Sequence, residues 1–220
     1  MARWEIRTGA VLILLLAGAI PLLGSILSAY ALQVALLTFL YVALATSWNL
    51  FSGYTGYVFF GQPSFFGLGA YVAAILMTRA GASWYLGAMA GGLGAVLLAL
   101  AVGYPCLRLR GPYFAVATLG LNEALRLIFL LDLFRYIPRL WVASPWGEIT
   151  RGDLGIWLPP TAAGMRLYVF YAMGLLALSS LLLSWLIARS QFGLRLVAIR
   201  EDEAAAEALG VSTTRHKLLA

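Results

Sequence analysis

The sequence predicts an all-helical integral membrane protein, built as a bundle of about six transmembrane helices. Hydrophobic residues make up 62% of the 220 residues and charged residues only 11%, and the mean hydropathy is +0.89. Soluble domains are about half apolar and a quarter charged. A water-soluble fold could not bury this much apolar surface, so the predicted solvent is a lipid bilayer.

Long apolar segments are the second observation behind this fold class. A helix needs about 20 apolar residues to cross the hydrocarbon core. Six segments approach or reach this length, and they cover residues 11–29, 34–51, 65–78, 86–104, 113–131 and 168–188. The third is short unless residues before it contribute to the helix.

The first segment has a second interpretation as a cleaved signal peptide. Arg3 and Arg7 precede it, and residues 29–31 (Ala-Tyr-Ala) resemble a signal-peptidase site. The apolar run is long for a signal peptide, however, and contains Pro21 and Gly24. We therefore expect a retained first helix.

The basic residues are the third observation, because they lie beside the apolar segments and are biased towards one side. Six crossings place nine of them on the side of the N-terminus: Arg3, Arg7, Arg108, Arg110, Arg189, Arg195, Arg200, Arg215 and Lys217. Five fall on the other side: Arg79, Arg135, Arg139, Arg151 and Arg166. The positive-inside rule then predicts a cytoplasmic N-terminus in the inner (plasma) membrane, a cytoplasmic loop at 189–215 and an external loop at 132–167.

Several function classes are disfavoured by the composition. The net charge of +6 could indicate nucleic-acid binding, but the cations form no stripe with interleaved aromatic residues. One cysteine, Cys106, and one histidine, His216, allow neither an intrachain disulfide nor a multi-histidine metal site. Hydrolase, zinc-protease and Walker A motifs are absent from the sequence. We expect no enzyme activity and no cofactor.

The stretch "SGYTGYVFFGQPSFFGLGAY" (52–71) is rich in glycine and contains Pro63. So many helix breakers are difficult to keep in one straight helix. Broken helices at membrane depth often line transport paths, whereas small residues also let neighbouring helices pack closely. Both interpretations stay open, and the candidate path or gate residues here are Asn49, Gly53, Gly56, Gly61, Gln62 and Gly67.

The fifth segment carries polar residues at a depth where charge is costly. Asn122, Glu123 and Arg126 lie in "LGLNEALRLIF" (119–129), and Glu123 is about 15 Å along a helix from Tyr113. Glu123 and Arg126 share a helix face and can form an ion pair. This group is either part of a path, gate or subunit contact, or a structural pair that satisfies itself.

A short charged stretch, "AIREDEAAAEALG" (198–210), contrasts with the apolar chain around it and follows a basic turn, "ARSQFGLRLVAIR". Asp202 or Glu201 can cap a helix start and Gly210 can end it. The predicted helix has two faces, one apolar (Ala204, Ala205, Ala208, Leu209) and one with Glu203 and Glu207. A helix this short is unstable alone, so we expect it to dock on another surface.

Three blocks resemble the permease family of branched-chain amino acid ABC transporters, the LivM-like subunit. They are "SQFGLRLVAIREDEAAAEALGVSTTRHKLLA" (190–220), "GYTGYVFFGQPSFFGLGAYVAAIL" (53–76) and "LRLRGPYFAVATLGLNEALRLI" (107–128). The resemblance implies a single transmembrane permease domain that works with a second related permease, two cytoplasmic ATPases and an external solute-binding protein. It also implies an ATPase-coupling segment comprising Glu203, Ala204, Ala205, Glu207, Ala208, Leu209 and Gly210.

The chain also departs from the family. Phe60 and Gln62 stand where the family commonly has serine and histidine, and "TRGDLGI" (150–156) only approximates an external family motif. Family members continue with further helices after the coupling segment, so we expect this chain to be a truncated piece. Alternatives are the same machine carrying urea or short-chain amides, an ion-coupled secondary transporter that uses Glu123 and Arg126, and, least favoured, a membrane-bound enzyme.

Overall fold

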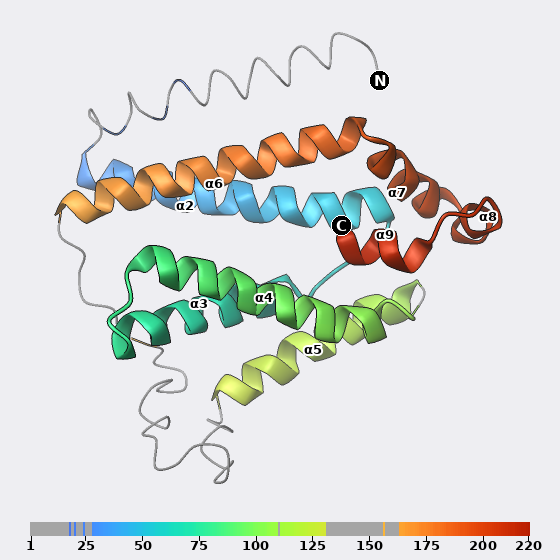
Figure 1. Ribbon diagram of the computed structural model, residues 1–220, viewed down its shortest axis with the longest axis horizontal. Coiled ribbons are helices and arrows are strands. Elements are labelled where there is room, and N and C mark those ends of the chain that lie inside the picture. Colours follow the sequence, from blue (N-terminus) through green and yellow to red (C-terminus); the bar gives the residue numbers. More distant parts are fainter. Residues whose placement is uncertain are drawn as a thin grey trace. The chain divides into compact units, whose positions relative to one another are not determined.

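The computed structural model describes residues 18, 20, 24, 28–109, 111–130, 156 and 163–220, and contains helices but no strand within those residues. Its helices form two compact units (Figure 1). One unit comprises residues 1–56 and 160–220 except Leu219, and the other comprises residues 57–159 with Leu219. The predicted all-helical fold class is confirmed.

The first unit is built on two long apolar helices. Helix α2 spans Ala29–Trp48 and continues as the π-helix η1, Asn49–Gly53, and it packs beside α6, Ala163–Arg189 (Figure 1). The ring centroids of Phe39 and Phe170 lie 5.4 Å apart between them, and Phe170 is fully buried. Both helices run in the same direction, so their C-terminal ends lie at the same end of this unit.

Three helices form the second unit: α3 (Gln62–Arg79), α4 (Trp84–Cys106) and α5 (Pro112–Leu130). Helices α3 and α4 form an antiparallel hairpin that depends on glycine. A Cβ atom on Gly69 would lie 3.2 Å from the carbonyl oxygen of Gly91, and one on Gly91 would overlap the carbonyl oxygen of Gly69. For these residues, close packing of small residues is the interpretation that the structure bears out.

We expect Gly91→Ala to destabilise the α3–α4 hairpin, because backbone rather than a flexible side chain blocks the added methyl group. Overpacking of this kind costs about 1–3 kcal/mol. The midpoint of thermal unfolding of the purified protein in detergent measures it, at about 2–4 °C per kcal/mol. Gly92→Ala is the matched control, since a Cβ there meets nothing within 4 Å; equal midpoints for the two variants would contradict the prediction.

The predicted segments agree with the helices to within a few residues at most boundaries. The largest differences are at α2, which begins at Ala29 rather than 34, and at α6, which begins at Ala163, inside the predicted 132–167 loop. Most of that loop and most of the segment at 11–29 lie outside the described residues. Within the described residues, three helices are long and apolar enough to cross a membrane: Ala29–Gly53, Trp84–Cys106 and Arg166–Arg189.

The number of crossings stays a prediction, but the direction of the helices constrains it. Because α2 and α6 run in parallel within one unit, an odd number of crossings must separate them. Among the helices that the structure describes, either α4 alone or α3, α4 and α5 together meet this condition. Helices α3 and α5 are 18 and 19 residues long and contain the polar residues that lower their hydropathy.

Helices α7 (Gln191–Glu201), α8 (Glu203–Ala208) and α9 (Thr213–Leu219) follow α6, and we call them the terminal cap. The prediction of a basic turn over residues 188–200 was wrong, since most of these residues form α7. Ser190 caps α7 by accepting a hydrogen bond from the Gly193 amide at 3.1 Å. A Cβ on Gly193 would overlap the carbonyl oxygen of Ile187, so the sharp α6–α7 turn requires glycine.

Candidate functional site

Helix α8 is formed and ended by local signals in the sequence. The Asp202 carboxylate accepts a hydrogen bond from the Ala205 amide at 3.0 Å, which caps the first turn. The φ angle of Gly210 is 84°, a conformation that favours glycine after a helix end. The predicted cap and stop are confirmed, and Asp202 rather than Glu201 is the capping residue.

The apolar side chains of α8 are exposed. Ala204, Ala205 and Ala208 are accessible to solvent, and Leu209 retains 86% of its accessible surface. Only Ala206 is buried among the residues of α8. These four exposed residues, which we call the α8 face, are a small apolar surface on an otherwise polar segment.

The acidic residues of α8 are not part of this face, because both bind α9. The Glu203 carboxylate lies 2.5 Å from the Lys217 ammonium group, and the Lys217 side chain is only 1% exposed. The Glu207 carboxylate accepts a hydrogen bond from the Thr213 hydroxyl at 2.7 Å. Of the predicted coupling residues, Glu203 and Glu207 therefore hold the terminal cap together and Gly210 ends the helix.

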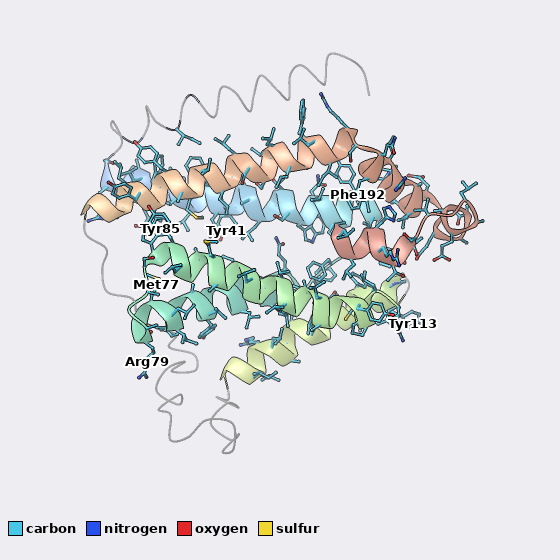
Figure 2. The ribbon with its side chains drawn as sticks, viewed as in Figure 1. Tyr41, Met77, Arg79, Tyr85, Tyr113 and Phe192 are labelled. Atoms are coloured by element: carbon cyan, nitrogen blue, oxygen red, sulfur yellow. The ribbon has the colours of Figure 1, made fainter. Side chains whose placement is uncertain are left out.

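A second contact joins α7 to α9 around the single histidine. The His216 ring stacks on Phe192 with a centroid distance of 5.5 Å. Phe192 is labelled in Figure 2. His216 Nδ1 lies 2.7 Å from the Ser212 carbonyl oxygen, so this nitrogen carries the proton and donates it. The other ring nitrogen, Nε2, lies 3.4 Å from Nη1 of Arg195 and can accept from it.

The candidate path residues Asn49, Gly53 and Gly56 lie in the first unit, at the end of the α2–η1 helix. The helix breaks here as the glycine content predicts, and Gly56 has a φ angle of 74°. A Cβ on Gly53 would overlap the carboxamide oxygen of Asn49. Arg200 of α7 donates to the Gly53 carbonyl oxygen from Nη1 at 3.1 Å, so the break lies directly against the terminal cap.

The remaining glycine-segment candidates lie in the second unit, where Gly61 is buried beside Phe59 and Gln62 opens α3. The Ser64 hydroxyl donates to the Asn122 side-chain oxygen at 2.9 Å. The Phe60 amide donates to the Thr118 hydroxyl at 3.2 Å. These two bonds attach the start of α3 to the polar part of α5. Gly67 has open space around it.

Glu123 and Arg126 form the predicted i,i+3 ion pair, with Nη1 of Arg126 3.1 Å from Oε1 of Glu123. Their side chains are 54% and 65% exposed, respectively. The two charges therefore compensate each other on α5, and both side chains remain more than half exposed. Among the described residues, no cluster of three histidine, cysteine or acidic side chains could hold a metal ion.

Long apolar helices with one polar, helical cap define an integral membrane protein of the helical-bundle class. Residues 30–220 match the family described as "Branched-chain amino acid transport system / permease component", and the chain belongs to this family.

Two curated relatives carry the same printed name, "High-affinity branched-chain amino acid transport system permease protein LivM". The chain is 31% identical to the Escherichia coli K12 protein over 227 residues, which covers 96% of this chain and 52% of the relative. It is 30% identical to the Salmonella typhimurium LT2 protein over 207 residues, which covers 86% of this chain and 48% of the relative. The chain spans about half the length of these relatives. No solved structure gives a significant match.

Four residues that make these contacts were not predicted from the sequence: Arg200 and Lys217 in the first unit, and Ser64 and Thr118 in the second. Arg200 and Lys217 were counted only as charges that orient the protein. Their partners, Gly53 and Glu203, lie 147 and 14 residues away, beyond the reach of a helical pattern. Pro63 indicates a helix start, but no local pattern links Ser64 to Asn122, which lies 58 residues away.

Proposed function

We propose that the chain is the membrane-spanning permease subunit of an ABC importer, which carries branched-chain amino acids across the cytoplasmic membrane by ATP-driven alternating access. The observation that carries this proposal is the α8 face. It is an exposed apolar surface on a short helix. An ion pair and a hydrogen bond attach this helix to α9. Such a rigid, small projection suits a groove in a soluble partner.

The partners follow from this assignment. Two cytoplasmic ATPases would receive the α8 faces of this chain and of a second, related permease subunit, and an external solute-binding protein would deliver the substrate. The membrane lipid covers the apolar helices. The terminal cap and the N-terminus then lie in the cytoplasm of an inner (plasma) membrane protein, and ATP hydrolysis belongs to the partners rather than to this chain.

The proposal is tested by purifying the full-length protein from its native membrane and identifying what copurifies. An ATPase subunit is expected, together with ATP-dependent uptake of tritiated leucine after reconstitution with the solute-binding protein. Uptake of labelled urea or acetamide instead of leucine would support an ABC importer with a different substrate. Absence of any ATPase, with uptake that needs only an ion gradient, would overturn the ABC assignment.

Glu123→Gln separates the two transport mechanisms. Because Glu123 is satisfied by Arg126 on its own helix, we expect the variant to keep uptake that depends on ATP. A protonophore should leave the initial uptake rate of both proteins unchanged when ATP is supplied. Asn122→Ala is the matched change one residue away, which removes the bond to Ser64. Loss of gradient-driven uptake in Glu123→Gln alone would instead assign Glu123 to ion coupling.

A further inference from the structure

The end of the α2–η1 helix has an unusual source for one of its hydrogen bonds. The last carbonyl groups of a helix have no partner within the helix, and they accept hydrogen bonds from water, from capping groups or from side chains. The Phe51 carbonyl accepts from the Thr55 hydroxyl at 2.8 Å, and the Ser52 carbonyl accepts from the Gly56 amide at 3.1 Å. The Gly53 carbonyl accepts from Arg200, which belongs to α7.

The Arg200 guanidinium group is held in position for this bond. Its Nε and Nη2 atoms donate to the Glu201 carboxylate at 3.3 and 2.9 Å, which leaves Nη1 directed at the Gly53 carbonyl oxygen. The planar guanidinium group allows these donors to act together, and a lysine could not reproduce them. A cation is also favoured at the negative end of the helix dipole.

Gly56 makes room for the Arg200 side chain. A Cβ on Gly56 would lie 2.6 Å from Cγ of Arg200, so the aliphatic stem of the arginine lies against the glycine backbone. The positive φ angle of Gly56 turns the chain away at this point. The contact therefore has two parts, a hydrogen bond to Gly53 and a steric fit to Gly56.

Arg200 is also close to α8 along the chain. Asp202 alone separates α7 from α8, and it belongs to both: its amide donates to Ala198 of α7 at 3.1 Å, and its carboxylate caps α8. Leu196 and Ile199 of α7 are buried, so α7 is anchored just before this junction. Because a single residue joins the two helices, a displacement of α8 would also move α7 and Arg200.

The element at the other end of the contact is a π-helical turn, Asn49–Gly53. A π-helical turn holds one residue more than an α-helical turn, and such turns occur often at functional sites. Conversion of η1 to α-helix would rotate the following residues by about 100° about the helix axis. The Arg200 bond lies on the last residue of η1, where it can favour one of the two forms.

We propose that Arg200 is the positioning residue that couples α8 to the membrane helices, by fixing the π-helical end of α2 through Gly53 and Gly56. This inference rests on the proposed function, since it assumes that an ATPase moves α8. Coupling energies between sites are about 1–3 kcal/mol, which corresponds to 5- to 150-fold effects.

The test compares Arg200→Ala, Arg200→Lys and the unchanged full-length protein, each purified with its partner subunits and reconstituted with the solute-binding protein. The readout is tritiated leucine transported per ATP hydrolysed, normalised to assembled complex. We expect a loss of about tenfold or more for Arg200→Ala, and partial rescue by Arg200→Lys, with ATPase copurification unchanged. Arg195→Ala is the matched control, because it removes a guanidinium group from the same helix whose hydrogen bond goes to His216 instead.

Gly56→Ala is a second test of the same transport ratio, in a variant that retains Arg200. It strains the positive φ angle and displaces Arg200, whereas Gly81→Ala adds the same kind of strain at φ 59° with open space around it. Only Gly56→Ala should lower the ratio. An unchanged ratio in Arg200→Ala overturns the inference, and so does reduced assembly with a normal ratio, which would make the residue structural. Absence of an ATPase from the unchanged protein would overturn the proposed function instead.

Discussion

Leu209→Asp is expected to abolish copurification of the ATPase while the protein still inserts in the membrane. Leu209 is the largest side chain of the α8 face and is 86% exposed in this chain. Burial of a leucine side chain in a partner groove is worth about 1.5–3 kcal/mol. An aspartate loses that term and also places a carboxylate where water is excluded, so the affinity should fall by about 100-fold or more.

The control for this change is Thr214→Asp, which adds the same charge at another exposed position of the terminal cap. Ala205→Asp, on the α8 face, should behave as Leu209→Asp does. Membrane content of each variant, measured before solubilisation, separates loss of docking from loss of the protein. Retention of the ATPase by both α8-face variants, at normal stoichiometry, would show that the partner binds elsewhere.

Local patterns predicted much of this site correctly. Asp202 and Gly210 bracket α8 as expected, because capping and termination depend on residues within one helical turn. The Glu123–Arg126 pair was predicted for the same reason. The α8 face was also predicted from the spacing of its four apolar residues, since a short helix has few ways to arrange them.

The contacts that position α8 could not be predicted in this way. Lys217 lies in α9, 14 residues after Glu203 of α8, and a turn separates the two helices. No helical periodicity links the two residues. Helix α7 was missed because its glycine and three nearby arginines were interpreted as one basic turn, although Gly193 is needed at the α6–α7 corner. The candidate path residues were treated as one group, but they divide between the two units of the structure.

The ion pair between Glu203 and Lys217 should have the largest effect on the stability of the terminal cap. Loss of one partner of a buried pair costs about 3–5 kcal/mol, and the two side chains are 17% and 1% exposed. Glu203→Leu leaves the more buried group, the Lys217 ammonium, without this carboxylate. We therefore expect Glu203→Leu to destabilise α8 and α9 more than Lys217→Met does, because the Glu203 carboxylate can regain some water.

Hydrogen exchange of the α8 and α9 amides measures this effect, since local opening exposes those amides without unfolding the membrane helices. Protection in Glu203→Leu should fall towards that of an unfolded segment. The double variant, Glu203→Leu with Lys217→Met, should recover most of it, because two apolar side chains can replace a buried ion pair. Arg215→Met removes an exposed cation from the same helix and should leave protection unchanged. If the double variant is no better protected than Glu203→Leu, packing rather than charge pairing holds α8 on α9, and the rigid support inferred for the α8 face has a different origin.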